Sequence, residues 1–172
     1  MFIEKLESPA KESNVCCALF HSEQWDNVRH SWSEKPFLKD SVPEIFHVPL
    51  PGSYPKAIAR MWKRAKEAGA APGPHDFLLL AHDPSAFKAE LYMAVTKDIE
   101  GADSVKITGD FLSKVYEGSY GDVPKCLRKT DEFLAANSMV SKKYYIYFPY
   151  CPECAKKYGH NYIVVLAEVE PL

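Results

Sequence analysis

The tripeptide Gly-Ser-Tyr occurs twice in this chain, at residues 52–54 and again at 118–120, and its surroundings repeat with it. A strand-like stretch precedes each copy, residues 44–50 before the first and 110–117 before the second, and a proline and a helix-like stretch follow. Glycine at a strand-to-helix turn accepts a positive φ and lets neighbouring backbones approach closely. Because whole elements recur in the same order, the chain is predicted to contain two copies of one structural unit.

The two helix-like stretches each carry one apolar face with helical spacing. The first face consists of Ile58, Met61, Trp62 and Ala65, and the second of Val123, Cys126, Leu127, Thr130 and Leu134. Asp122 is placed to cap the second helix, and Gly69 and Asn137 lie where the two helices are expected to end.

Two strand-like stretches follow each helix, residues 76–83 and 89–96 in the first half and 144–150 and 161–169 in the second. Each half therefore reads strand–helix–strand–strand. Such a unit buries only one face of its sheet, so two units are expected to complete each other. We predict an α+β fold with tandem strand–helix–strand–strand units, pseudo-twofold symmetry and a groove between the units.

The predicted domain occupies residues 43–172. Its first unit spans 43–97 and its second unit 104–170, with a polar link between them. Residues 1–42 fit neither unit and are predicted to form an N-terminal extension packed on the domain.

Charge and composition set limits on partners and location. The 21 Lys and Arg residues are scattered and balanced by 23 Asp and Glu residues, so we expect no nucleic-acid partner. No stretch approaches the roughly 18 consecutive apolar residues of a membrane span, so no membrane partner is expected. The amino-terminal stretch lacks the apolar core of a secretory leader. Five cysteines, an odd number, then favour free thiols and a cytoplasmic location.

The duplicated unit, the turn VYEGSYGDVPK from Val115 and the strand YYIYFPY from Tyr144 resemble GyrI-like small-molecule-binding domains. This family includes the effector-binding domains of some multidrug-sensing transcription regulators. The resemblance covers residues 43–169, and the stretch YFPYCPECAKKYGHNYIVV from Tyr147 looks like a stand-alone branch often labelled hydrolase.

The resemblance implies a ligand held among aromatic rings in the groove, near a buried Glu. In some stand-alone members it implies water addition to the strained cyclopropane ring of DNA-alkylating compounds. Tyr145 stands where the family pattern has a Glu, which disfavours a cationic drug as ligand. The chain also has no room for a separate DNA-binding domain, which argues against a transcription regulator.

Alternation along the strands predicts which aromatic side chains line the groove. Tyr145 and Tyr147 are expected to face away from the helix, and Glu90 and Tyr92 likewise. The predicted ligand-binding residues are Tyr54, Trp62, Tyr92, Tyr116, Tyr120, Tyr145, Tyr147 and Phe148. Aromatic walls bind flat lipophilic ligands, although tyrosines also serve simply to pack a sheet.

Water addition to a strained ring needs a general acid or base beside the reacting atom. Glu117, directly before the second Gly-Ser-Tyr, and Glu90, at the start of a strand, are the predicted catalytic residues. Aromatic surroundings are expected to raise the pKa of such a carboxyl towards neutrality. The alternative for each is an exposed acid at a strand end.

Cys151 and Cys154 form a C-x-x-C pair after a strand, and three interpretations remain open. A redox dithiol needs the first Cys at a helix N-terminus. Structural zinc needs four ligands, for which Cys16, Cys17 and His160 are the further candidates. The third interpretation is a thiol pair that tightens the loop, and we expect neither a metal nor a cofactor.

We predict that the protein binds a lipophilic aromatic small molecule in the groove and hydrolyses it, for example by opening a cyclopropane ring. Two alternatives remain: a non-catalytic small-molecule or multidrug binder, and a thiol redox protein that uses the CPEC pair.

Overall fold

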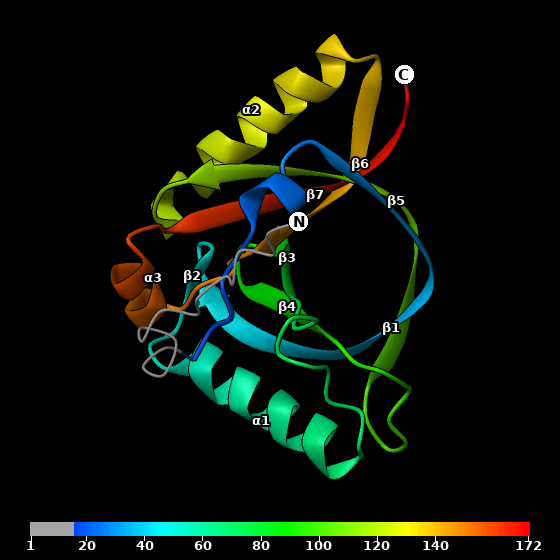
Figure 1. Cartoon of the computed structure of the whole chain (residues 1–172), viewed down its shortest axis with the longest axis vertical. Coiled ribbons are helices and arrows are strands. Elements are labelled where there is room, and N and C mark those ends of the chain that lie inside the picture. The colour runs from blue at the N-terminus through cyan, green and yellow to red at the C-terminus, as the bar shows by residue number, and fades with distance from the viewer. Residues whose placement is uncertain (1–15) are drawn as a thin grey trace, which may run out of the picture.

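Seven antiparallel strands form one sheet that closes on itself (Figure 1). The strand order is β2-β1-β4-β3-β6-β7-β5, and the ring closes because the long first strand also pairs with the fifth. The computed structural model describes residues 16–172, so part of the predicted extension, residues 1–15, lies outside the described residues.

The elements follow one another along the chain with these bounds. The strands are β1 Val28–Ile45, β2 Val48–Pro49, β3 Leu79–Ser85, β4 Lys88–Ala94, β5 Ser104–Glu117, β6 Met139–Tyr147 and β7 Tyr162–Pro171. The helices are α1 Ser53–Glu67, α2 Val123–Ala136 and α3 Pro152–Tyr158, with 3₁₀ turns at Ser22–Gln24 and Tyr120–Asp122.

The α+β class is confirmed, and the order strand–helix–strand–strand recurs as β1-α1-β3-β4 and β5-α2-β6-β7. Within the ring, the strands of the first half lie together in the order β1-β4-β3, and those of the second half in the order β6-β7-β5. The halves meet twice, at the pairs β3–β6 and β1–β5.

The first strand is much longer than the sequence pattern indicates. β1 begins at Val28, inside the predicted N-terminal extension, whereas the predicted strand begins at Glu44. Its first part pairs with β5 and its later part with β4. A bulge between Trp32 and Lys35 interrupts the alternation of side chains between the two faces of the sheet. The first part of β1 therefore lacks the alternating apolar pattern by which a strand is predicted from sequence.

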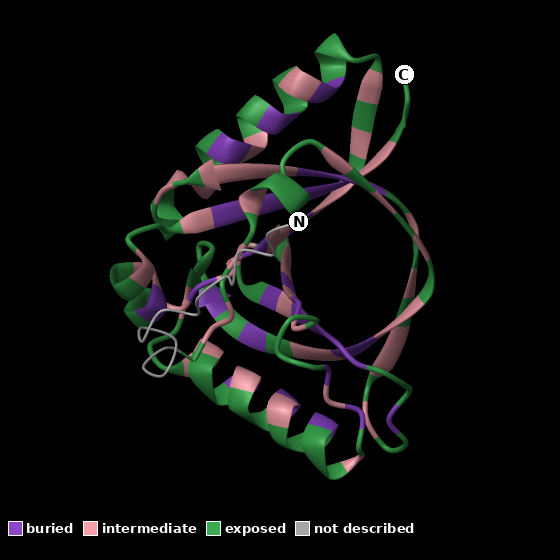
Figure 2. Cartoon of the chain, in the orientation of Figure 1, coloured by how far each residue is buried: buried purple, intermediate pink, exposed green. Residues whose placement is uncertain are grey.

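Apolar side chains pack on both faces of the ring. Figure 2 shows that buried segments occur both in the strands of the ring and in the helices outside it. On the outer face α1 presents Ala57, Met61 and Ala65 to β1 and β4, and α2 covers β6 and β7. The inner face carries a cluster of mostly aromatic and aliphatic side chains: Phe37, Leu78, Leu80, Tyr92, Ala94, Phe111, Tyr145, Tyr147, Val164 and Leu166. We call this set the inner cluster.

The two Gly-Ser-Tyr turns need glycine for different reasons. Gly52 caps α1 with φ of 75°, in the left-handed region that glycine adopts without strain. At Gly118 a Cβ would lie 2.7 Å from the Asp122 carboxylate, so a side chain there would force Asp122 to move. That carboxylate accepts a hydrogen bond from the Ser119 amide at 2.7 Å.

None of the helices in the described part of the chain is long and apolar enough to cross a membrane.

Candidate active site

A buried carboxyl group lies at the end of β1, with the side chains of Asp83 and Tyr120 near it. Glu44 is 3% exposed, and neither of its carboxylate oxygens has a hydrogen-bond partner among the described residues. It follows Val42 by two residues on the same face of β1, the face that packs against α1. A buried polar group without a hydrogen bond costs about 1–3 kcal/mol, which makes Glu44 a candidate for a functional role.

The surroundings of Glu44 come from both halves of the chain. Asp83 of β3 and His47 of the β1–β2 turn contact each other, with His47 Nδ1 3.1 Å from the Asp83 carboxylate. Tyr54 lies in the first turn of α1, and Tyr120 lies before α2. The Tyr120 hydroxyl donates to the backbone oxygen of His47 at 3.2 Å, so the second half of the chain reaches the first at this point.

Glu44, Asp83 and the nearby tyrosines influence one another's pKa values. Burial raises the pKa of Glu44 from its ordinary 4.5 to about 7, and the negative charge of Asp83 adds to the effect. Burial, followed by the charge of Glu44, raises the pKa of Tyr120 to about 12. Glu44 is therefore poised to exchange a proton near neutral pH, whereas the tyrosine hydroxyls stay protonated and donate hydrogen bonds.

The raised pKa of Glu44 makes the folded state less stable as the pH rises. Below pH 4.5 both the folded and the unfolded states hold the proton, so the titration of Glu44 does not affect stability there. Between pH 4.5 and 7 only the folded state holds it, and stability falls as the pH rises. We expect the group to destabilise the fold by about 3 kcal/mol above pH 7 relative to acid pH.

Urea titrations at several pH values measure this effect. Glu44→Gln removes the titration, so its stability above pH 7 should exceed that of the natural chain, and the difference should shrink towards pH 4.5. Glu90→Gln serves as a matched control, because that carboxyl pairs with Lys39. Equal pH dependence in the natural chain and in Glu44→Gln would show that Glu44 is not perturbed.

Exposed apolar side chains surround the buried carboxyl. Three of the chain segments near Glu44 carry them: the β1–β2 turn and the residues after it, the β3–β4 turn, and the turn before α2. The members are Ile45, Phe46, Val48, Leu50, Phe87 and Tyr120, which we call the apolar rim. Phe46 is 74% exposed, and its ring centroid lies 5.6 Å from that of Phe87. Clustered exposed apolar groups mark ligand or partner contacts.

The turn at the centre of the apolar rim is strained. Phe46 and His47 form the two-residue connection between β1 and β2, with φ of 49° and 65°. Positive φ at both positions is the type I′ pattern, for which Asn-Gly is the favoured sequence. A bulky side chain in this region costs roughly 1–2 kcal/mol per residue, and such strain concentrates at functional sites.

Relief of this strain should raise stability. We expect Phe46→Asn combined with His47→Gly to increase the free energy of unfolding by about 1 kcal/mol relative to Phe46→Ala, which removes the ring but keeps the backbone strain. Urea denaturation measures the difference. No gain over Phe46→Ala would contradict the view that the backbone at this turn is strained.

Glu44, His47 and Asp83 also each offer a ligand atom within 4.8 Å of the others. Three protein ligands suffice for a catalytic metal. In this structure His47 Nδ1 lies 3.1 Å from the Asp83 carboxylate.

The two acids predicted from the sequence lie elsewhere. Glu90 forms an ion pair with Lys39 at 2.5 Å; burial opposes ionisation, but Lys39 outweighs it and lowers the pKa of Glu90. Glu117 is exposed and lies 2.5 Å from His160 Nδ1. Both residues remain predictions as catalytic groups. The sequence pattern does not single out Glu44, because the strand that it predicts begins at this residue; the spacing of Glu44 from Val42 places it on the helix-facing side.

The predicted strand faces match the structure. Tyr92, Tyr145 and Tyr147 all belong to the inner cluster, away from the helices. The rings of Tyr92 and Tyr145 meet edge to face with centroids 5.5 Å apart. The Tyr147 ring lies 5.5 Å from Trp25 and 6.3 Å from Phe20. Rings from the N-terminal segment therefore occupy space beside these tyrosines, whose role in ligand binding stays a prediction.

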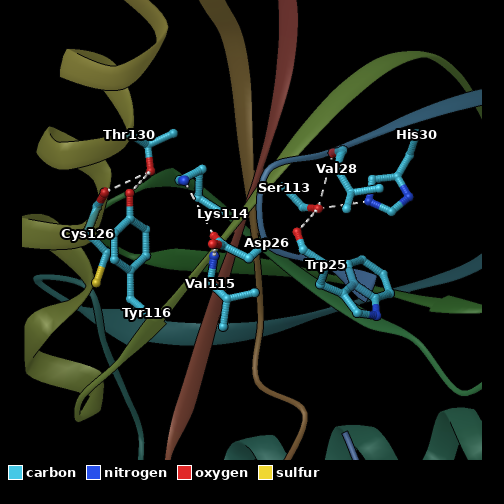
Figure 3. Close-up of polar contacts among 10 residues, drawn as sticks. All are labelled: Trp25, Asp26, Val28, His30, Ser113, Lys114, Val115, Tyr116, Cys126 and Thr130. Carbon is cyan, nitrogen blue, oxygen red and sulfur yellow. Dashed lines mark hydrogen bonds and ion pairs between the residues drawn. The ribbon is translucent and has the colours of Figure 1, made fainter. Parts of the chain in front are cut away.

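The N-terminal segment is held on β5 by polar contacts (Figure 3). The Ser113 hydroxyl donates to the backbone oxygen of Trp25 and lies 2.8 Å from His30 Nε2. The Asp26 carboxylate accepts from the Val115 amide at 3.0 Å and pairs with Lys114 at 3.4 Å. These contacts position Trp25 beside the inner cluster.

Tyr116 and Glu117 line a surface hollow of about 200 Å³ beside α2, together with Asp122, Lys125, Cys126 and Lys129. The Tyr116 hydroxyl lies 2.9 Å from that of Thr130, as Figure 3 shows. This hollow is distinct from the surroundings of Glu44.

The remaining predicted ligand-binding residues fall on the helix side of the sheet. Trp62 of α1 contacts Phe77, with ring centroids 5.9 Å apart. Phe148 stacks on Tyr120 at 5.8 Å, which brings it close to the Glu44 site. Tyr54 and Tyr120 therefore lie near Glu44, and Phe148 contacts one of them, Tyr120.

The geometry of the CPEC pair does not favour a redox dithiol. Cys151 is the N-cap of α3, as that interpretation requires. Burial would raise the pKa of Cys154, but hydrogen bonds from Cys17, Cys16 and Cys151 outweigh it and lower that pKa to about 7. Cys154 is only 1% exposed, so the thiol with the lowered pKa is not accessible for exchange with a substrate.

Comparison with known proteins shows the family to which the chain belongs. The family model described as Bacterial hydrolase matches residues 7–169, so the chain belongs to that family. No curated protein matches the sequence.

Solved structures share the fold at low sequence identity. The EcmrR C-terminal domain superposes with a TM-score of 0.64 at 13% identity, covering 86% of this chain and 99% of that domain. A hydrolase from Listeria innocua superposes with a TM-score of 0.60 at 12% identity, covering 84% of this chain and 92% of that one. Both relationships fit the GyrI-like fold that the sequence resembles.

One expectation from the sequence is corrected by these comparisons. A further similar chain, with a TM-score of 0.61 and 13% identity, comes from a cryo-EM structure of an EcmrR–DNA complex; the match covers 86% of this chain and 58% of that one. A chain that contains this fold is thus found with DNA, so the expectation of no nucleic-acid partner is wrong. That expectation was based on the balanced charge of this chain. The charge of one domain does not show whether a larger assembly that contains it binds DNA.

Proposed function

We propose that the protein hydrolyses a lipophilic small molecule by adding water to it at Glu44. The observation that carries this proposal is a carboxyl that is 3% exposed, has no hydrogen-bond partner among the described residues, and has its pKa raised to about 7. An acid–base catalyst is most effective when its pKa lies near the working pH. Membership of a family described as hydrolases supports the same reaction class.

In the proposed reaction Glu44 acts as a general base on water. The water oxygen forms a bond to a carbon of the substrate, and the strained carbon–carbon bond at that atom breaks. Its electron pair passes to the rest of the substrate, which finally receives the proton that Glu44 removed. The product is the substrate plus one water, and Glu44 returns to its carboxylate form.

The two halves of the chain supply matching parts of this site. Tyr54 and Tyr120 come from the two copies of Gly-Ser-Tyr. Burial is the main cause of the raised pKa of both hydroxyls, and the charge of Glu44 adds to it. The strand orders β1-β4-β3 and β6-β7-β5 support the pseudo-twofold pairing of the two units. We assign the two hydroxyls to orienting the substrate.

A lipophilic, uncharged substrate fits the surroundings best. The apolar rim offers exposed aromatic and aliphatic contacts next to Glu44. The inner cluster is less suited to a cation, because Lys143 Nζ already lies 4.8 Å from the centroid of Tyr145 and Lys39 Nζ 5.8 Å from that of Tyr92.

The test is incubation of the full chain with a panel of aromatic lipophiles that includes a cyclopropane-bearing alkylator. Mass spectrometry of the mixture should show a product heavier by one water molecule. Phe46→Ala and Phe87→Ala should weaken substrate binding, whereas Val140→Ala, an exposed apolar residue outside the apolar rim, is the control and should not. Failure of every panel member to react would contradict a hydrolase of this substrate class.

A non-catalytic binder is the second candidate, favoured by the similarity to the EcmrR C-terminal domain over 99% of that domain. It shares the surroundings of Glu44 and differs only in the outcome. Saturable binding with no product from any panel member would favour the binder.

A further inference from the structure

Four cysteines from two distant parts of the chain converge on one point. Cys16 and Cys17 lie in the N-terminal segment, and Cys151 and Cys154 lie at the start of α3. All four sulfur atoms lie within 4.8 Å of one another. The Cys16 sulfur is 3.5 Å from that of Cys151, 3.5 Å from that of Cys154 and 3.9 Å from that of Cys17.

We propose that these four cysteines bind a structural zinc ion. In a tetrahedral site with zinc–sulfur bonds of about 2.3 Å, neighbouring sulfurs are separated by about 3.8 Å. The three distances from Cys16 lie close to that value. Four thiolates with no open position form a closed set of ligands, which is the structural rather than the catalytic type of zinc site.

Backbone amides support the sulfur positions. The Cys151 amide donates to the Cys17 sulfur at 3.4 Å, and the Cys154 amide donates to the Cys151 sulfur at 3.5 Å. Hydrogen bonds to coordinating sulfurs stabilise their negative charge and fix their orientation. Gly159 ends α3 with φ of 78°, and Tyr158 then reaches back to donate to the backbone oxygen of Cys17 at 2.9 Å.

Other uses of four cysteines fit the geometry less well. All four are free thiols, and a disulfide requires only two sulfurs at about 2.05 Å rather than four around a common centre. An iron–sulfur cluster places several metal and sulfide atoms between its ligands, so its cysteine sulfurs lie further apart than the 3.5–3.9 Å found here.

Zinc at this point would tie the N-terminal segment to the loop between β6 and β7. The segment then runs past Phe20, whose amide donates to the Tyr150 hydroxyl at 2.8 Å, to Trp25 beside Tyr147. Metal binding is thereby coupled to closure of the inner cluster, since ligands from separate segments meet only in the folded chain.

Metal analysis of the full chain, purified without chelators or a histidine tag, tests the proposal directly. We expect about one zinc ion per chain. Replacement of zinc by cobalt(II) should produce the intense visible absorption of a tetrahedral tetrathiolate ion. These two measurements use the natural chain and so do not depend on whether a variant folds.

Variants then locate the site. Cys151→Ser and Cys154→Ser should each lose most of the bound zinc, whereas Cys126→Ala should keep it, because Cys126 is buried between α2 and β7 and lies outside the cluster. Removal of zinc by a strong chelator should lower the Tm of the natural chain, and added zinc should restore it.

Three results would overturn the proposal. Natural chain that purifies without metal and does not take up zinc or cobalt would exclude a metal site here. Iron in place of zinc would exclude the zinc assignment. Full zinc content in Cys151→Ser and Cys154→Ser would place the metal elsewhere, with Glu44, His47 and Asp83 as the alternative ligands.

Discussion

Glu44→Gln is expected to lower kcat/KM for water addition by about 10²–10⁴-fold, because glutamine cannot accept a proton from water. The substitution keeps the size of the side chain and leaves the apolar rim intact, so substrate binding should change little. Steady-state rates with the most reactive panel substrate, together with calorimetric titration of a non-reacting analogue, separate the two effects.

The pH profile gives a second readout of the same group. If Glu44 is the base, kcat/KM of the natural chain rises as the pH passes through about 7, since the active form is the carboxylate. Glu90→Gln is the matched control and should retain both the rate and the profile. A full rate in Glu44→Gln, or a large loss in Glu90→Gln or Glu117→Gln, would move the catalytic role to one of the acids predicted from the sequence.

Tyr147→Ala is expected to lower the free energy of unfolding by about 3–5 kcal/mol, the usual cost of removing a buried aromatic side chain. Tyr147 lies in the inner cluster and contacts the rings of Trp25 and Phe20 from the N-terminal segment. Urea denaturation followed by tryptophan fluorescence measures the loss, and the signal of Trp25 reports on release of the segment.

Tyr147→Phe provides the matched control for the ring. It removes only the hydroxyl, which donates to the backbone oxygen of Phe77 at 3.4 Å, so its effect should stay below about 1 kcal/mol. The opposite pattern, an unchanged stability in Tyr147→Ala with ligand affinity reduced by about 1–3 kcal/mol, would support the binding role that the sequence predicts for this residue.

The aromatic residues of the chain fall into two sets, one that stabilises the interior and one that is exposed near Glu44. The inner cluster is packed against rings of the N-terminal segment, and the apolar rim with its strained turn lies near the only described carboxyl whose buried oxygens lack a partner. A stable interior and a strained, exposed rim are the common division between scaffold and site. The site that we propose lies on the helix side of the sheet, where the turns of both halves meet.

Much of the fold followed from local patterns. The period of apolar residues predicted α1 and α2 with the correct buried faces, and alternation placed Tyr145 and Tyr147 away from the helices. The start of β1 and the helix α3 were missed. A bulge disrupts the alternation in β1, and α3 is too short to show a helical period.

By itself, the sequence determined the α+β class, the recurring strand–helix–strand–strand order and the identity of the aromatic and cysteine residues, because these depend on local spacing and composition. Only the tertiary structure decided that Glu44 is the carboxyl without a partner, and that Cys16 and Cys17 meet Cys151 and Cys154. The pKa of a carboxyl depends on what surrounds it in three dimensions, and a set of metal ligands exists only when distant segments are brought together. Neither property has a signature in the spacing of neighbouring residues.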